Sequence, residues 1–252
     1  MLLLFTSGVA WILYSAFAVS KVEMRKYIKL LGVRVKRVRS AAREIERKSF
    51  HLTGLIVPLL YSTMLEHWNW RHRDCVIFFV SGTAFGWCFD IARLMFPVVR
   101  RNFPLGKILR DKEETQLCGA CYFSLGVTLA IALFPPEIAM TSIVFLVLGD
   151  MSAALIGVSF GGEAVSLKLG REGKKSAEGS VAMFVICFFI GIAVFRAVPL
   201  SEYIAFVGAF MATVVELYEP FALNDNLTIP IFSSLAMTWA LHRVEVLCDT
   251  LY

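Results

Sequence analysis

Apolar residues in this chain gather in long runs instead of recurring at the 3.6-residue or two-residue spacing of amphipathic helices and strands. A helix needs about 20 residues to cross the apolar core of a bilayer. The runs of about that length cover residues 2–20, 50–66, 75–99, 117–134, 138–160, 180–198, 202–218 and 228–247. The pattern therefore predicts an all-α fold, a polytopic membrane helical bundle with seven or eight transmembrane helices.

Composition supports a membrane location. Hydrophobic residues make up 58% of the 252 residues and the mean hydropathy is +0.68, well above the range of soluble domains. No basic residue precedes the first run, so we expect a retained anchor and not a cleaved signal peptide. We predict two parts: an N-terminal membrane anchor with a basic cytosolic segment, residues 1–43, and a membrane-embedded domain, residues 44–252.

The net charge of +5 comes largely from one segment, because residues 21–48 hold eleven of the 25 Lys and Arg. Such a segment favours anionic lipid headgroups, and we expect no nucleic-acid partner because the segment has few aromatic residues for stacking. Residues 21–49, 100–116, 161–179 and 219–227 together hold 20 of the 25 basic residues. The positive-inside rule places these segments in the cytosol. The sequon Asn226-Leu227-Thr228 should therefore carry no glycan.

Three acidic residues interrupt apolar runs near this predicted cytosolic end: Asp90, Asp150 and Glu216. An acidic residue at the centre of a membrane helix costs about 2.5–3.5 kcal/mol, so it usually faces a partner or water. Asp90 has Arg93 three residues later, the spacing of a local ion pair. Asp150 has no basic residue near it in sequence. It is either a metal or substrate ligand, or a structural hydrogen-bonding group between helices.

Small residues lie beside Asp150 at intervals of four, at Gly149, Ala153 and Gly157, and favour close helix packing. The polar loop 170–180 combines glycines with Lys174 and Lys175, residue types that accommodate and neutralise phosphate. It is not a Walker A loop, and a solvated basic loop is the alternative. Asn224-Asp225-Asn226 indicates either a helix cap or a cation and phosphate site.

Two further features have ordinary explanations. His51 follows Arg47 and Lys48 at the start of a predicted helix, where an interface residue is as plausible as a catalytic one. Cys118 and Cys121 have CxxC spacing, but no second pair accompanies them. We interpret the six cysteines mainly as small apolar residues.

Short motifs in a fixed order resemble those of the CTP-dependent lipid kinases, namely the yeast-type diacylglycerol kinase, dolichol kinase and phytol kinase. The motifs are Arg47-Lys48-Ser49-Phe50-His51, Asp90-Ile91-Ala92-Arg93, Arg110–Glu114 with Gly119 and Tyr122, Gly149-Asp150 with Ala153, Ala154, Gly157 and Gly161, Gly173-Lys174-Lys175-Ser176 with Glu178, Gly179 and Ser180, Glu216, and Asp225-Asn226-Leu227-Thr228-Ile229-Pro230. They span roughly residues 44–235. The last motif and the Asp90-x-x-Arg93-x-x-x-Pro97 run are most similar to the diacylglycerol kinase branch.

The resemblance implies that the γ-phosphoryl of CTP is transferred to a membrane lipid hydroxyl with Mg²⁺ or another divalent cation such as Ca²⁺. Phosphoryl transfer depends mainly on positioning and charge neutralisation. On this hypothesis Asp150 and Asp225 hold the cation, and Glu216 or Glu113 orients the hydroxyl or accepts its proton. Lys174 contributes to catalysis. The nucleotide contacts are Arg47, Lys48, Arg110, Gly173, Lys174, Lys175, Ser176, Gly179 and Asn226.

Several alternatives remain at this stage. The lipid alcohol is expected to be diacylglycerol, with dolichol, another polyprenol or phytol as alternatives. A phosphatidate cytidylyltransferase is disfavoured because its His-Gly-Gly-x-x-Asp-Arg run is absent, and an ion-coupled transporter because no inverted repeat is present. We expect an endoplasmic reticulum membrane protein with its active site on the cytosolic side. The sequence does not indicate the oligomeric state.

Overall fold

The computed structural model describes residues 51–101, 111–160, 168–170, 175–220 and 223–251. Its elements are the helices η1 (Thr53–Leu55), α4 (Ile56–Glu66), α5 (His72–Met95), α6 (Pro97–Arg101), η2 (Asp111–Glu114), α7 (Gly119–Leu133), α8 (Pro136–Val144), η3 (Phe145–Gly149), α9 (Asp150–Phe160), α10 (Ala177–Phe195), α11 (Ser201–Tyr218) and α12 (Asp225–Leu251), and the strands β1 (Lys168–Leu169) and β2 (Lys175–Ser176).

The predicted all-α membrane bundle is confirmed. Within the described residues, four helical segments are long and apolar enough to cross a membrane: His72–Met95, Pro136–Ser159, Ala177–Phe195 and Ser201–Tyr218. Thr53–Glu66 and Gly119–Leu133 are shorter apolar helices, and α12 is longer but less apolar. The first predicted span, residues 2–20, lies outside the described residues.

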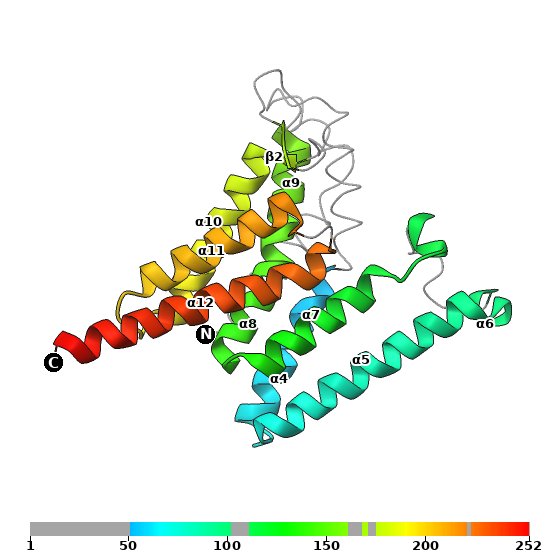
Figure 1. Ribbon diagram of the computed structural model, residues 1–252, viewed down its shortest axis with the longest axis horizontal. Coiled ribbons are helices and arrows are strands. Elements are labelled where there is room, and N and C mark those ends of the chain that lie inside the picture. The colour runs from blue at the N-terminus through cyan, green and yellow to red at the C-terminus, as the bar shows by residue number, and fades with distance from the viewer. Residues whose placement is uncertain (1–50, 102–110, 161–167, 171–174, 221–222, 252) are drawn as a thin grey trace, which may run out of the picture.

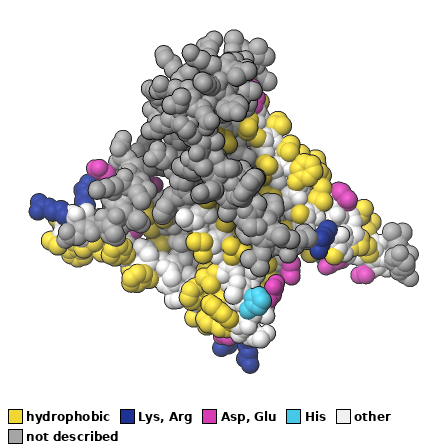
Figure 2. Space-filling model, turned by 180° about the vertical axis from the view of Figure 1, so that it is seen from behind, with side chains coloured by type: hydrophobic (Ala, Val, Ile, Leu, Met, Phe, Trp, Pro, Cys, Tyr) yellow, Lys and Arg dark blue, Asp and Glu magenta, His cyan; other side chains and the backbone are white. Residues whose placement is uncertain are grey.

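Hydrophobic side chains on the outside of the bundle face what would be lipid. On α5, Phe85 is 75% exposed and Ile77 is 56% exposed, and α10 exposes Val181 and Phe189. Much of the described surface on the face drawn in Figure 2 is hydrophobic. Exposed apolar surface on this scale is costly in water but expected in a bilayer.

The core divides into two packed groups. Phe145, Met183 and Met237 are fully buried where η3, α10 and α12 meet, and α11 packs between α10 and α12. Tyr61 and Ile131 belong to the second group, which joins α4, α5, α7 and α8. In Figure 1, α5 lies at one edge of the bundle and contacts α7.

Two predicted helices have internal breaks. The run 75–99 divides at Phe96, since Pro97 starts α6 and disfavours helical geometry at the residue before it. The run 138–160 contains a π-helical turn, η3, that ends immediately before Asp150. Such turns are rare and often occur at functional sites.

The chain crosses the bundle repeatedly, so its connections alternate between two ends. Within the described residues, α6, α9 and α11 finish at one end of the bundle, where α7, α10 and α12 begin. The described connections at the other end are short, at residues 67–71, 134–135 and 196–200. The first end carries most of the described polar residues that the sequence singles out.

Candidate active site

Lys175 and Glu216 form a close ion pair at this end of the bundle. Lys175 Nζ lies 2.5 Å from Glu216 Oε1 and 3.5 Å from Glu219 Oε1. Glu216 is 3% exposed near the end of α11, and its Oε2 has no hydrogen-bond partner among the residues described. The contact joins residues that are 41 positions apart.

A small hairpin holds Lys175 in this position. β1 and β2 are antiparallel, with Leu169 opposite Lys175. Gly170 follows β1 with a φ of +83°, a conformation that glycine adopts without strain. A Cβ at Gly170 would lie 2.9 Å from the carbonyl oxygen of Leu217, so Gly170 packs closely against the end of α11. The sequence did not predict this hairpin.

Ser176, directly after Lys175, is the N-cap residue of α10. Its Oγ accepts a hydrogen bond from the backbone N–H of Gly179 at 3.1 Å, a standard N-cap. A Cβ at Gly179 would lie 2.6 Å from the carbonyl oxygen of Ala153, and one at Gly157 would lie 3.1 Å from Ser176 Oγ. The close packing predicted for the small residues after Asp150 is therefore confirmed between α9 and α10.

Asp150 is 4% exposed at the first residue of α9. His51 Nε2 lies 3.4 Å from Asp150 Oδ2, and the His51 ring contacts Phe123. No basic residue is near Asp150 in the sequence, but the fold places His51, the first described residue, beside it. His51 thus belongs to the site, where sequence reasoning left its role open.

The start of α12 brings Asp225 and Asn226 to the same end. The Asn226 backbone N–H donates to Asn224 Oδ1 at 3.0 Å and to Asp225 Oδ1 at 2.9 Å. Asn226 Nδ2 donates to the carbonyl oxygen of Gly119 at 3.3 Å. Glu113 Oε1 accepts from the Gly119 N–H at 2.8 Å, which fixes Glu113 to the start of α7.

Comparison with known proteins identifies the family. An uncharacterised protein of Rickettsia prowazekii is 31% identical over 203 residues, which cover 77% of this chain and 93% of the relative. CTP-dependent diacylglycerol kinase 1 of Schizosaccharomyces pombe is 25% identical over 209 residues, 77% of this chain and 92% of that enzyme. The Saccharomyces cerevisiae enzyme of the same name is 26% identical over 224 residues, covering 77% and 72%. This chain belongs to the CTP-dependent lipid kinase family.

This lipid kinase matches no family model. It also matches no solved structure.

Electrostatics keep Lys175 of the lipid kinase charged. Burial lowers the pKa of Lys175, but the charges of Glu216, Asp225 and Asp150 outweigh this effect and raise the pKa above its usual value. The three carboxylates that act on this ammonium group belong to α11, α12 and α9. The described side chains of the site thus carry more negative than positive charge, which suits a divalent cation. The cation can in turn bind a phosphate-bearing ligand.

The structure covers only part of the predicted site. It brings together Asp150, Lys175, Glu216 and Asp225, with Ser176 and Gly179 beside Lys175, while Glu113 and Asn226 meet at Gly119. Glu219, which sequence reasoning missed, also contacts Lys175. The predictions for Arg47, Lys48, Arg110, Gly173 and Lys174 lie outside the described residues.

Proposed function

We propose that this lipid kinase transfers the γ-phosphoryl of CTP to the hydroxyl of diacylglycerol and produces phosphatidate and CDP. The yeast relatives named as CTP-dependent diacylglycerol kinases support the donor and the acceptor. The observation that carries the proposal is the contact of Lys175 with Glu216, within the electrostatic influence of Asp150 and Asp225. A lipid with its tails in the bilayer would present its hydroxyl at this level.

Asp150 and Asp225 are the residues proposed to hold Mg²⁺ or another divalent cation such as Ca²⁺. Hard cations of this kind prefer carboxylate oxygens, and the excess of acidic side chains around Lys175 fits that preference. When bound, the cation would neutralise phosphate charge that develops during transfer. His51 Nε2 lies 3.4 Å from Asp150 Oδ2, beside the proposed cation.

Glu216 is the favoured base for the lipid hydroxyl. Its Oε1 is held by Lys175, while the buried Oε2 has no hydrogen-bond partner within the described part of the chain. An acceptor in this state can take a hydrogen bond from the hydroxyl, orient its oxygen toward the phosphorus and accept its proton. Glu113 serves less well, because its Oε1 already accepts the N–H of Gly119.

Lys175, which contacts Glu216 on one side, would contact the phosphate oxygens on its other side. Its charge is maintained by the surrounding carboxylates, and α10 begins two residues later, at Ala177. The backbone N–H groups at the start of this helix add to the attraction for a phosphate. Lys174, Gly173, Arg110, Arg47 and Lys48 would complete the nucleotide contacts, while Asn226 would position the segment that carries Asp225.

The charge distribution supports an active site on the cytosolic face, and we propose the endoplasmic reticulum as the membrane. We also propose residues 44–252 as the kinase domain and residues 1–43 as an anchor with a basic segment. Removal of residues 1–43 should leave phosphoryl transfer by the purified protein intact. Loss of turnover in a truncated protein that still folds would reject this boundary.

One experiment tests the proposed reaction. The purified protein in mixed micelles is incubated with γ-labelled CTP or γ-labelled ATP and with diacylglycerol, dolichol or phytol. We expect label to pass from CTP to diacylglycerol, with CDP as the second product. Labelling of dolichol or phytol alone would reject diacylglycerol as the substrate. Formation of CDP-lipid with release of diphosphate would contradict phosphoryl transfer.

A further inference from the structure

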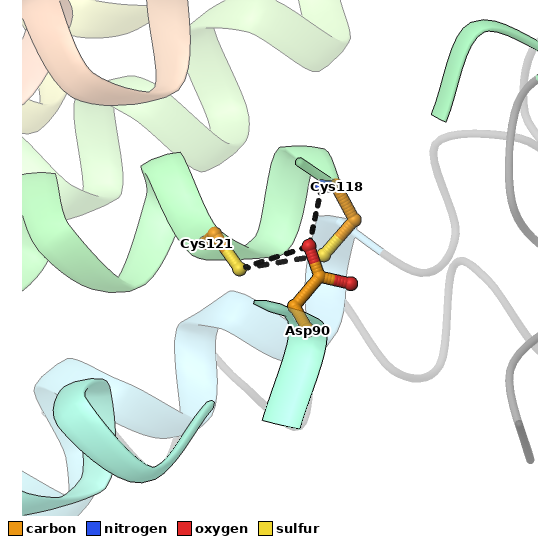
Figure 3. Close-up of side chains that lie close together, drawn as sticks. All are labelled: Asp90, Cys118 and Cys121. Atoms are coloured by element: carbon orange, nitrogen blue, oxygen red, sulfur yellow. Dashed lines mark hydrogen bonds between the residues drawn. The ribbon is translucent and has the colours of Figure 1, made fainter. Parts of the chain in front are cut away.

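A second group of ligand-type side chains lies where α5 ends and α7 begins. Asp90, Cys118 and Cys121 each present one ligand atom, and these three atoms lie within 4.8 Å of one another. Cys118 is the N-cap residue of α7 and Cys121 lies in its first turn. The three-residue spacing places both sulfurs on the side of α7 that faces Asp90 (Figure 3).

The distances within this group match the edges of a small coordination polyhedron. The two sulfur atoms are 3.6 Å apart, and Cys121 Sγ is 3.5 Å from Asp90 Oδ2. Zinc in a tetrahedral site has bonds of about 2.3 Å to sulfur and about 2.0 Å to oxygen, which separate neighbouring ligands by about 3.5–3.8 Å. A cation could therefore enter with small side-chain movements.

The surroundings of Asp90 resemble the outer layer of a metal site. Asp90 Oδ1 accepts a hydrogen bond from Arg93 Nε at 2.7 Å, and Oδ2 accepts the backbone N–H of Cys118 at 2.9 Å. Hydrogen bonds of this kind orient a ligating carboxylate. Arg93 also donates to the carbonyl oxygens of Glu113 and Gln116, at 2.8 and 3.0 Å. The group thus adjoins the segment that carries Glu113.

The charges of the ligands, Arg93 and one divalent cation balance. Two thiolates and the Asp90 carboxylate carry three negative charges, and Arg93 with one divalent cation carries three positive charges. Binding exchanges two thiol protons for one dication, so the net charge of this buried region does not change. Asp90 and Cys121 are buried, whereas Cys118 is half-buried, which gives a cation one side of approach.

We propose that Asp90, Cys118 and Cys121 bind a soft divalent cation of the zinc type, with one further position open to water. Thiolate ligands select zinc-like cations over Mg²⁺, so this site differs from the one proposed at Asp150 and Asp225. A disulfide between the cysteines is the competing outcome, but it would leave the oriented carboxylate of Asp90 without a function. Bound metal would fix α5 to the start of α7, and hence Glu113 and Gly119 next to Asn226.

The test uses Co²⁺ as a spectroscopic probe on the full-length protein, purified in detergent under reducing conditions and freed of metal with EDTA. We expect one equivalent of Co²⁺ to give a thiolate-to-cobalt charge-transfer band. Zn²⁺ should displace it and Mg²⁺ should not. Loss of even a hydrogen-bonding partner of a ligand weakens metal affinity by about 10–100-fold, so Cys118→Ser should weaken Co²⁺ binding by at least about tenfold.

Matched controls make the result decisive. Cys88→Ser changes an exposed cysteine on the same helix as Asp90 and should leave the band unchanged. Cys121→Ser provides a second ligand variant if Cys118→Ser does not fold. Absence of the band, its persistence in both ligand variants, or a mass showing that the two thiols have lost two hydrogens in the isolated protein would overturn the proposal. None of these readouts depends on kinase activity.

Discussion

Lys175 Nζ lies 2.5 Å from Glu216 Oε1, although Lys175 belongs to a two-residue strand and Glu216 to the end of a membrane helix. The ammonium group holds one carboxylate oxygen, while the other is buried without a hydrogen-bond partner among the described residues. A carboxylate arranged in this way can bind one further donor in a fixed direction. The substrate hydroxyl is the donor that the proposed reaction supplies.

Glu216→Gln should lower kcat by at least about 100-fold, because general-base catalysis typically contributes 10²–10⁴-fold. Glutamine preserves the side-chain shape and keeps an oxygen for Lys175, so the variant should fold and insert. Steady-state assays with CTP and lipid measure the effect. Glu202→Gln, at an exposed position at the other end of α11, is the matched control. Wild-type kcat in Glu216→Gln would remove Glu216 from the chemistry.

Gly126→Ala should destabilise the bundle by about 1–3 kcal/mol, the usual cost of adding a carbon to a tightly packed site. The new Cβ would lie 2.5 Å from the carbonyl oxygen of Asn226, where α7 touches the start of α12. Gly82→Ala on α5 is the control, because no atom lies within 4 Å of its Cβ. Thermal unfolding in detergent compares the two variants. An unchanged Tm for Gly126→Ala would reject this close contact.

The sequon at Asn226 should carry no glycan when the protein is made in eukaryotic cells. The proposed orientation places it in the cytosol, and the side chain is 7% exposed and donates to Gly119. A sequon introduced into the turn at residues 196–200 should be glycosylated, because that turn lies at the opposite end. Treatment with a glycosidase followed by gel electrophoresis reports both sites. Glycan at Asn226 would reverse the orientation.

The membrane helices could be predicted from sequence because hydrophobic runs of bilayer length leave few other folds. The breaks within these helices were harder to predict from the sequence. The π-helical turn before Asp150, Phe145–Gly149, contains only apolar residues and a glycine, so no polar residue within the turn marks it. The hairpin at Lys175 has only two residues in each strand, too few for an alternating pattern. Its position depends on the contact of Gly170 with α11.

The candidate site was predictable as a set of residue types, but not as a set of contacts. Asp150 stands out in sequence because a carboxylate in an apolar run requires a partner, yet nothing there identifies His51. The pairing of Asp90 with Arg93 was predictable because both lie on one helix. The links from Arg93 to Glu113 and Gln116, and from Glu219 to Lys175, arise only when separate segments pack together.

The central claim is that carboxylates from separate helices act on one nucleotide–cation unit. The direct test is a double-variant cycle of Asp150→Asn and Asp225→Asn, with kcat/KM measured by transfer of label from γ-labelled CTP to diacylglycerol. Each single variant should lose most of its activity. The kcat/KM of the double variant should be little lower than that of the less active single variant, because the effects of residues that act as a unit are strongly non-additive. Near-wild-type activity in either single variant, or losses that multiply, would contradict the shared site.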